Sequence, residues 1–276
     1  MTGDDYELVD SGDGRKFERF GAYTLVRPCS QALWRPSLPP GEWARADASF
    51  DREDGNRWHG RNRLPKEWNI ETAGMKFRLG GTDFGHLGIF PEQRAQWRWI
   101  RDTIRAAGRK ISALNLFAYS GGSTLASALG GAEVCHLDAS KGMVEWAREN
   151  ARLNALAGHP IRWIVDDAHK FMKRETRRGR RYDAIILDPP TFGRGAGGET
   201  YKIERDLKDT LGLVRDLLSP APLFVLFSSH TPGLSPIVAG NVLGQLFPKA
   251  KIETGEMLLE GRGLPAPSGI FARAEF

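Results

Sequence analysis

From residue 111 to residue 246, short apolar runs alternate with longer segments whose apolar residues recur every three or four positions. Runs of the first kind are typical of buried strands, and segments of the second kind are typical of amphipathic helices. Their alternation predicts a parallel sheet with helices on both faces. We expect strands over residues 111–118, 133–138, 161–166, 182–188 and 222–228, and helices over residues 121–130, 140–156, 168–178, 200–218 and 235–246.

The helix that follows Ser140 has the clearest pattern. Ser140 is a suitable N-cap residue, and Gly158 is expected to mark the end of the helix. The apolar face is expected to comprise Met143, Ala147, Ala151 and Leu153.

The end of the chain predicts two further strands, over residues 251–259 and 269–276, joined by a Gly- and Pro-rich connection. No helix fits between them, so the last strand should enter the sheet antiparallel to its neighbours. With the five strands above, this makes an α/β fold with a sheet of seven strands.

The beginning of the chain follows another pattern. Short strand candidates, among them residues 23–27, 68–71 and 75–79, are separated by Pro, Gly and charged positions. We therefore predict a small β-rich N-terminal domain over residues 1–79 and a second domain over residues 80–276. A helix from Pro91 to Ala107 should join the two, with Pro91 in its first turn.

Composition narrows the class of protein. With 41% hydrophobic residues among 276, the chain can bury a sizeable core, and no apolar run approaches the roughly 18 residues of a membrane-spanning helix. The first 13 residues are acidic, unlike a signal peptide. Cys29 and Cys135 suffice neither for a disulfide framework nor for a metal cluster. We expect a soluble, cytoplasmic protein with no metal site; the sequence predicts no oligomeric state.

The net charge of +5 is distributed unevenly. Residues 1–79 carry 13 Lys and Arg against 13 Asp and Glu, whereas residues 170–181 carry seven against one. This basic run can contact the phosphates of a nucleic acid, or it can be a solvated helix end. We favour the second interpretation.

The segment Asp188-Pro189-Pro190-Thr191-Phe192 carries the most specific chemical signal. It follows the apolar run 184–187, which has the length and β-branched content of a buried parallel strand. The prolines end the strand because they cannot donate to its ladder. A carboxylate and a stiff backbone therefore stand at the carboxyl edge of the sheet, where ligands of open α/β sheets bind.

The turn after the first strand of the sheet can approach a ligand closely. Gly121 and Gly122 open the following helix, whose N-terminus suits an anionic group. The Gly-x-Gly-x-x-Gly pattern of dinucleotide sites is absent, because Phe117 and Tyr119 stand where its first two glycines would be. The turn therefore favours a smaller nucleoside ligand, or it is a simple strand-to-helix connection.

The next two strand ends carry carboxylates. Asp138 is placed to accept both hydroxyls of a ribose, although acidic residues also often precede helices. Asp167 can accept from an adenine amino group while the Ala168 amide faces the ring, or Asp166 and Asp167 can be an N-cap pair.

From about residue 80 onward, the chain resembles class I S-adenosylmethionine (AdoMet)-dependent methyltransferases, which have a Rossmann-like sheet. It is most similar to the bacterial 23S ribosomal RNA methyltransferases that modify cytosine C5 or guanine N7. The motifs that carry the resemblance are Gly88-Ile89-Phe90-Pro91-Glu92-Gln93-Arg94, Asn115 to Gly122, Leu137-Asp138-Ala139-Ser140, Trp146 to Asn154, Asp166-Asp167 and Asp188 to Phe192.

The resemblance implies AdoMet as the cofactor and RNA, in particular ribosomal RNA, as the substrate. The residues implied for the cofactor site are Gln93, Arg94, Phe117, Tyr119, Ser120, Gly121, Asp138, Ala139, Ser140, Asp167, Ala168 and Asp188. The residues implied for positioning the substrate are Asp188, Pro189, Pro190 and Phe192, with Phe192 stacking on the target ring.

The cytosine-C5 relatives use a cysteine that follows the fifth strand, and this chain has Ser228 at that place. Serine is a poor nucleophile without an adjacent base. His230 would lie on the same side as Ser228 if the strand continued, but we favour a loop histidine there. A nitrogen nucleophile needs no covalent activation, so nitrogen is favoured over carbon as the methyl acceptor.

Two further features bear on RNA. Six of eight tryptophans fall in the first 99 residues; they either fill the core of the small domain or stack on bases, and Trp58 is the best stacking candidate. Residues 193–198, with Arg194, are expected to form a flexible loop that closes over the substrate or lies free at the surface. We keep two alternatives to an RNA methyltransferase. The protein methylates a small-molecule or protein amine, or it is an inactive AdoMet-binding protein associated with RNA.

Overall fold

The structure is a computed structural model of the chain, and it describes residues 4–52, 55–194, 198 and 200–276. By compactness the chain forms two units: Met1–Ala95 with Met257–Ser268, and Gln96–Glu256 with Gly269–Phe276. The boundary between independently folding domains, which we place after residue 79, stays a prediction. None of the described helices is long and apolar enough to cross a membrane.

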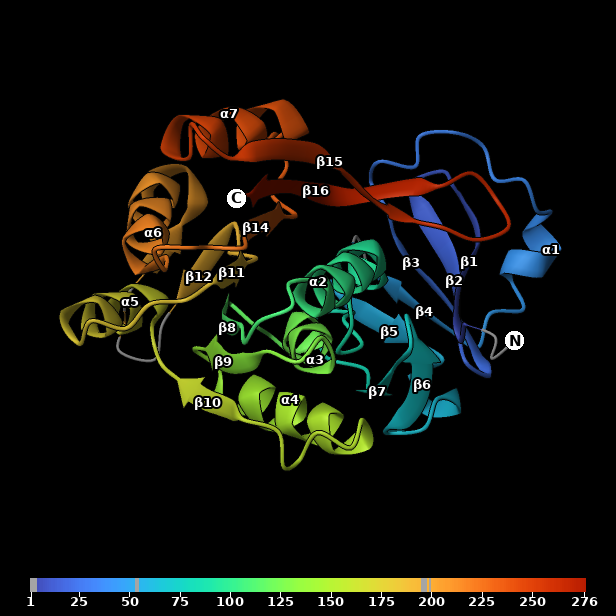
Figure 1. Cartoon of the computed structure of the whole chain (residues 1–276). Helices are drawn as coiled ribbons and strands as arrows, with labels where there is room; N and C mark the ends of the chain where they lie inside the picture. Colours follow the sequence, from blue (N-terminus) through green and yellow to red (C-terminus); the bar gives the residue numbers. More distant parts are fainter. Residues whose placement is uncertain (1–3, 53–54, 195–197, 199) are drawn as a thin grey trace. The chain divides into compact units, whose positions relative to one another are not determined.

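The first unit is rich in strands, as predicted (Figure 1). Its five-stranded sheet runs in chain order through β1 (Tyr6–Gly12), β2 (Arg15–Phe20), β3 (Tyr23–Pro28), β4 (Ala48–Asp51) and β5 (Arg57–His59). Neighbours are antiparallel except β3 and β4, which are parallel. A separate hairpin joins β6 (Trp68–Thr72) to β7 (Met75–Leu79), and the short helices are α1 (Pro40–Trp43), η1 (Arg61–Arg63) and η2 (Pro91–Gln93).

The seven-stranded sheet has the order β10-β9-β8-β11-β14-β16-β15. Its strands are β8 (Ser112–Leu116), β9 (Glu133–Asp138), β10 (Ile161–Val165), β11 (Ala184–Leu187), β14 (Phe224–Ser229), β15 (Lys251–Leu259) and β16 (Ala266–Glu275). Five strands of this sheet are mutually parallel: β8, β9, β10, β11 and β14. Strand β16 pairs antiparallel with β14. Both orientations confirm the predictions from sequence.

Helices cover both faces of this sheet (Figure 1). On one face, apolar residues of α5 (Ala168–Arg177), α6 (Ile203–Leu217) and α7 (Pro236–Leu246) form one buried cluster with inward side chains of the strands. On the other face lie α2 (Arg94–Ala106), α3 (Gly122–Leu129) and α4 (Lys141–Leu153). Since side chains of a strand alternate between the two faces, Cys135 faces the first layer and His136 faces the second.

Several predicted boundaries were wrong. The first strand ends at Leu116 because Phe117 has a left-handed backbone, and the helix expected from residue 200 begins at Ile203 because Thr200–Lys202 form strand β13. The helix after Ser140 ends at Leu153, well before Gly158.

A helix-ending motif without glycine explains the early end of α4. Ala155 has a φ of 58°, and the Leu156 N–H donates to the Ala151 carbonyl at 2.9 Å. This is the arrangement in which glycine normally takes the left-handed position. The buried face of α4 is confirmed at Ala147 and Ala151, but Val144 and Asn150 are buried in place of the predicted Met143 and Leu153, which are only partly buried.

Candidate active site at the carboxyl edge of the sheet

Five parallel strands end at one edge of the seven-stranded sheet. Each is followed by a residue with a side chain or backbone suited to a ligand. In sheet order from β10 to β14 these residues are Asp167, Asp138 (the last residue of β9), Phe117, Asp188 and His230. Because parallel strands bring their carboxyl ends together, residues that are more than 100 positions apart in the chain share one edge.

The turn after β8 has an unusual backbone. Phe117 and Tyr119 have φ values of 54° and 49°, which are left-handed and rare for bulky residues. Such conformations cost on the order of 1–3 kcal/mol each and cluster at ligand sites. The Ala118 N–H donates to the Leu137 carbonyl at 3.0 Å and holds the turn against the end of β9.

Asp138 completes this support. Its Oδ2 accepts from the Tyr119 N–H and its Oδ1 from the Ser140 N–H, both at 2.8 Å. Burial raises the pKa of this carboxyl above its ordinary value, although the two backbone hydrogen bonds act in the opposite direction. A carboxylate has about four acceptor positions, so two stay available for the hydroxyls of a ribose.

The backbone at the start of α3 lies close to its neighbours. Gly121 has a φ of 92°, and a Cβ there would stand 3.0 Å from the Cβ of Ala147. The carbonyl of the buried Ser120 accepts from the Asn150 side chain at 2.9 Å. Helix α4 therefore fixes the position of the turn.

A buried polar chain lies behind the turn. Asn115 donates to the Thr124 hydroxyl at 2.9 Å, and that hydroxyl lies 2.9 Å from His136 Nδ1. Burial, assisted by Arg148, lowers the pKa of His136 to about 3, so its ring is neutral. Among the described residues, His136 Nε2 is buried without a hydrogen-bond partner, and the ring lies beside Gly121.

These observations fit AdoMet. Asp138 offers acceptors for a ribose, the glycine turn allows close approach, and the buried His136 Nε2 next to that turn has an unused hydrogen-bonding position. When bound, AdoMet supplies a methyl group that its sulfonium has already activated. The residues named here would bind and orient that group.

The third strand end gives a mixed result. The Asp167 side chain is the N-cap of α5 and accepts from the Lys170 N–H at 2.8 Å, which is the simpler of the two interpretations. The Asp166 N–H donates to the Asp138 carbonyl at 3.2 Å and links the ends of β10 and β9. Contact of Asp167 and the buried Ala168 with an adenine stays a prediction.

Ser140 is confirmed as the N-cap of α4, where its hydroxyl accepts from the Met143 N–H at 3.4 Å. Ser140 and Ala139 are exposed directly after the end of β9. Their assignment to the cofactor site stays a prediction.

The segment predicted to position the substrate combines a carboxylate with apolar residues of different exposure. Asp188 is half-buried, Pro189 is buried, and Pro190 is exposed. The Phe192 side chain is 49% exposed, which is unusual for a ring of this size. A half-exposed aromatic ring next to an acceptor can stack on a planar base while the carboxylate or a carbonyl orients its polar edge.

The predicted flexible loop 193–198 begins as a strand. Residues Phe192–Arg194 form β12, which pairs antiparallel with β13 (Thr200–Lys202). Residues 195–197 and 199 lie outside the described part of the chain. The hairpin contacts the first turn, because the Tyr201 ring lies 5.4 Å from that of Phe117.

Tyr201, which packs against Phe117, escaped the sequence analysis. His230 follows the end of β14, as expected of a loop histidine, but its place 3.6 Å (Nδ1) from Asp188 Oδ1 was not predicted. The signal for His230 is that β14 neighbours β11, so residues just after these two strands meet. Strand β14 ends at Ser229, so the strand continuation required for a Ser228–His230 pair is missing.

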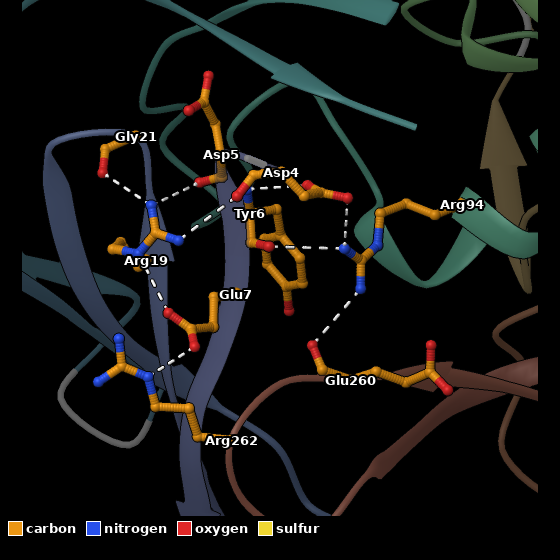
Figure 2. Close-up of polar contacts among 9 residues, drawn as sticks. All are labelled: Asp4, Asp5, Tyr6, Glu7, Arg19, Gly21, Arg94, Glu260 and Arg262. Atoms are coloured by element: carbon orange, nitrogen blue, oxygen red, sulfur yellow. Dashed lines mark hydrogen bonds and ion pairs between the residues drawn. The ribbon is translucent and has the colours of Figure 1, made fainter. Parts of the chain in front are cut away.

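Gln93 and Arg94 belong to the first unit. Gln93 ends η2 and is buried. Figure 2 shows the Arg94 guanidinium, which lies 3.1 Å from Asp4 Oδ2 and donates to the carbonyls of Tyr6 and Glu260 at 3.5 and 3.4 Å. Their role near the cofactor stays a prediction.

The tryptophans of the first unit serve its packing. The indole N–H groups of Trp34, Trp58 and Trp68 each donate to a backbone carbonyl. The Trp58 ring packs edge-on against Phe50 at 5.2 Å. These contacts favour the packing interpretation, although Trp34, Trp58 and Trp68 are only partly buried, whereas Trp43 is buried.

Fold and site together define an AdoMet-binding methyltransferase, and comparison with known proteins agrees. The family model for S-adenosylmethionine-dependent methyltransferases matches residues 47–237, and the chain belongs to this family. The crystal structure of a SAM-dependent methyltransferase from Agrobacterium tumefaciens is similar, with a TM-score of 0.92 and 38% identity over 99% of this chain and 91% of that chain.

Curated relatives match over a shorter region. The Ribosomal RNA large subunit methyltransferase K/L of Shewanella frigidimarina is 35% identical over 152 residues, which is 54% of this chain and 20% of that protein. The protein of the same name from Syntrophotalea carbinolica is 33% identical over 61% of this chain and 23% of its own length. The chain thus spans about a fifth of the length of these relatives.

Proposed function

We propose that this methyltransferase transfers the methyl group of AdoMet to a ring or exocyclic nitrogen of a base in ribosomal RNA. The similarity to relatives named as ribosomal RNA large subunit methyltransferases carries this proposal. The half-exposed Phe192, four residues after Asp188, supports it, because an exposed ring and a carboxylate in one short segment suit a planar base with a polar edge. With this substrate, the proposed location is the cytoplasm.

The proposed chemistry consists mainly of positioning. The activated methyl group needs a nucleophile in line with its bond to sulfur, and orientation alone can supply a large part of the acceleration. Phe192 and the Pro189-Pro190 segment would hold the base, and Asp188 would accept a hydrogen bond from its polar edge. His230, 3.6 Å from Asp188, would set the orientation of that carboxylate.

Tritium transfer tests the substrate class. Labelled AdoMet and the purified protein are incubated with total RNA, protein and metabolite fractions from cells that lack the gene. Label in the ribosomal RNA alone is the expected result. Label in the protein or metabolite fraction, with none in RNA, would replace the proposal by methylation of another amine.

Ser228→Ala tests the choice of nitrogen over carbon. Ser228 is buried in β14 where the cytosine-C5 relatives have their cysteine. If the acceptor is nitrogen, no covalent step involves this hydroxyl, and kcat should stay within about tenfold of the wild-type value. A complete loss of methyl transfer by a variant that still binds AdoMet would instead indicate a covalent role.

A further inference from the structure

The first unit contains a cavity that is built from the sheet and its connections. It has a volume of about 700 Å³, which lies within the range of roughly 300–1,000 Å³ of small-ligand sites. Its wall includes α1 and residues of β2, β3, β4 and β5, together with the segment 35–40. The motifs that define the methyltransferase sheet do not contribute to this wall.

Three exposed arginines line this cavity: Arg15, Arg35 and Arg63. Among the residues that the structure describes, none of the three has a carboxylate within ion-pair distance. Most other arginines of the unit are neutralised in this way, namely Arg19, Arg27, Arg45, Arg61, Arg78, Arg94 and Arg262. Residues 1–79 have no excess of positive charge, yet three arginines without a carboxylate partner line one cavity.

The carboxylates of the wall compensate this charge only in part. Asp13 and Asp47 also line the cavity. Asp47 Oδ2 already accepts from the Thr24 N–H at 2.7 Å and from the Thr24 hydroxyl at 2.9 Å, so it is tied into the fold. Three guanidinium groups against two carboxylates leave the wall with a positive charge.

One arginine is held in place by an aromatic ring. The Arg15 guanidinium lies 5.3 Å from the centre of the Trp43 ring, and the Trp43 N–H donates to Asp10 Oδ2 at 3.1 Å. A stacked guanidinium keeps its edge free, and this edge carries the planar set of donors that matches a phosphate. The Ser49 hydroxyl and the exposed His59 add polar groups to the same wall.

We infer that this cavity binds the sugar–phosphate backbone of an unpaired segment of the RNA substrate, away from the base that is methylated. The inference rests on the proposed function for the choice of RNA over other anions. Three arginines around one cavity suit successive phosphates of a single strand, whose spacing and flexibility allow each phosphate to reach a guanidinium. The cavity is therefore a docking site for substrate and takes no part in methyl transfer.

The triple variant R15Q/R35Q/R63Q of the full chain tests this inference. The probe is a fluorescein-labelled, unstructured RNA of 12 nucleotides, and fluorescence anisotropy gives its Kd over a series of salt concentrations. Loss of three phosphate contacts should weaken binding at least tenfold at low salt and reduce the slope of log Kd against log salt by about two. The matched control is Arg52→Gln, which removes an exposed arginine of the same unit that does not line the cavity.

A second variant tests the charge of the cavity without removing any arginine, in case the triple variant does not fold. Ala44 is exposed on the cavity wall, and Ala44→Glu adds a negative charge while all three arginines stay in place. Ala44→Glu should weaken RNA binding several-fold, whereas Ala44→Gln should not. AdoMet affinity and thermal unfolding should be the same in all variants.

The outcomes separate this inference from the proposed function. If the triple variant binds the RNA with unchanged affinity and salt slope, the docking site is refuted even when the protein methylates ribosomal RNA. If a glutamate-rich peptide of equal charge competes with the RNA as well as unlabelled RNA does, the cavity is a site for acidic peptides and the inference also fails. Arginine-dependent RNA binding without methyl transfer to RNA would support the cavity and refute the proposed function.

Discussion

The Asp138 carboxylate accepts two backbone hydrogen bonds while burial raises its pKa. The first bond supports the strained turn at Tyr119, and the second holds the start of α4. The same carboxylate is the predicted partner of a ribose. One side chain thus links the backbone of the turn to the proposed cofactor site.

Asp138→Ala should weaken AdoMet binding by about 2–4 kcal/mol, or roughly 30- to 1,000-fold in Kd, because charge-assisted hydrogen bonds are lost. Isothermal titration calorimetry measures this. The AdoMet affinity of Asp138→Asn, which keeps one acceptor oxygen, should lie between that of the wild type and that of Asp138→Ala. Unchanged affinity in the alanine variant would show that the ribose lies elsewhere. For the wild type, affinity should decline on acidification from a pH above the ordinary carboxyl value of 3.8, since the raised pKa protonates Asp138 early.

The buried, neutral ring of His136 leads us to expect that the fold loses stability in acid. Its pKa falls from 6.5 in the unfolded chain to about 3 in the folded protein, so below pH 6.5 the unfolded state binds the extra proton. The free energy of unfolding should therefore fall with decreasing pH between these two values, with a contribution of up to about 1.4 kcal/mol per pH unit. His136→Asn removes the titration.

Urea unfolding of the wild type and of His136→Asn at several pH values between 4 and 7 checks this. The difference in unfolding free energy between the two proteins should shrink as the pH falls. A difference that stays constant over this range would mean that His136 is not buried as a neutral ring.

At the scale of elements, α3 is held against α2 by the absence of a side chain. A Cβ at Gly122 would lie 2.5 Å from the Trp97 ring, closer than packed atoms approach. The contact fixes the helix that follows the turn predicted to bind the cofactor. Closeness to α2, rather than a left-handed backbone, therefore requires a glycine at this position.

Gly122→Ala should lower the free energy of unfolding by about 1–3 kcal/mol, because the added methyl group forces the helices apart. Gly212→Ala is the matched control: Gly212 lies within α6, nothing lies within 4 Å of its missing Cβ, and alanine there should raise stability by up to about 1 kcal/mol. Equal effects of both substitutions in urea unfolding would contradict the packing argument.

In the molecule as a whole, the first unit is assembled from two parts of the chain that are far apart in the sequence, and residues of both parts contact each other. Arg94 joins Asp4, Tyr6 and Glu260, and the guanidinium also stacks on the Tyr6 ring at 4.7 Å (Figure 2). The first and last parts of this unit, Met1–Ala95 and Met257–Ser268, meet at this arginine.

Arg94→Ala should lower the free energy of unfolding by about 3 kcal/mol, since it leaves a carboxylate and several carbonyls without their donor. Arg262→Ala removes an exposed ion pair with Glu7 in the same region and should cost less than about 1 kcal/mol. A variant of Arg94 with normal stability but weakened AdoMet binding would instead support the predicted place of Arg94 at the cofactor.

The sequence alone predicted the seven-stranded α/β sheet, its antiparallel last strand and the site motifs at strand ends. These follow from local features: the period of apolar residues, the N-cap chemistry at Ser140, and the prolines after Asp188, which follow a strand that ends at Leu187. Local sequence specifies local backbone, and the topology of parallel strands then places strand ends at one edge. The AdoMet family could be recognised because the motifs that carry the resemblance are also short and local.

The tertiary structure alone decided what depends on neighbours from other parts of the chain. The contact of His230 with Asp188 requires that β14 lie beside β11. The left-handed residue that ends α4 is Ala155, so no glycine in the sequence indicates this helix end. Whether Arg15 or Arg19 is neutralised depends on which carboxylate the fold brings near. Pairing, burial and strain are properties of residues in contact, so they arise only when the chain has folded.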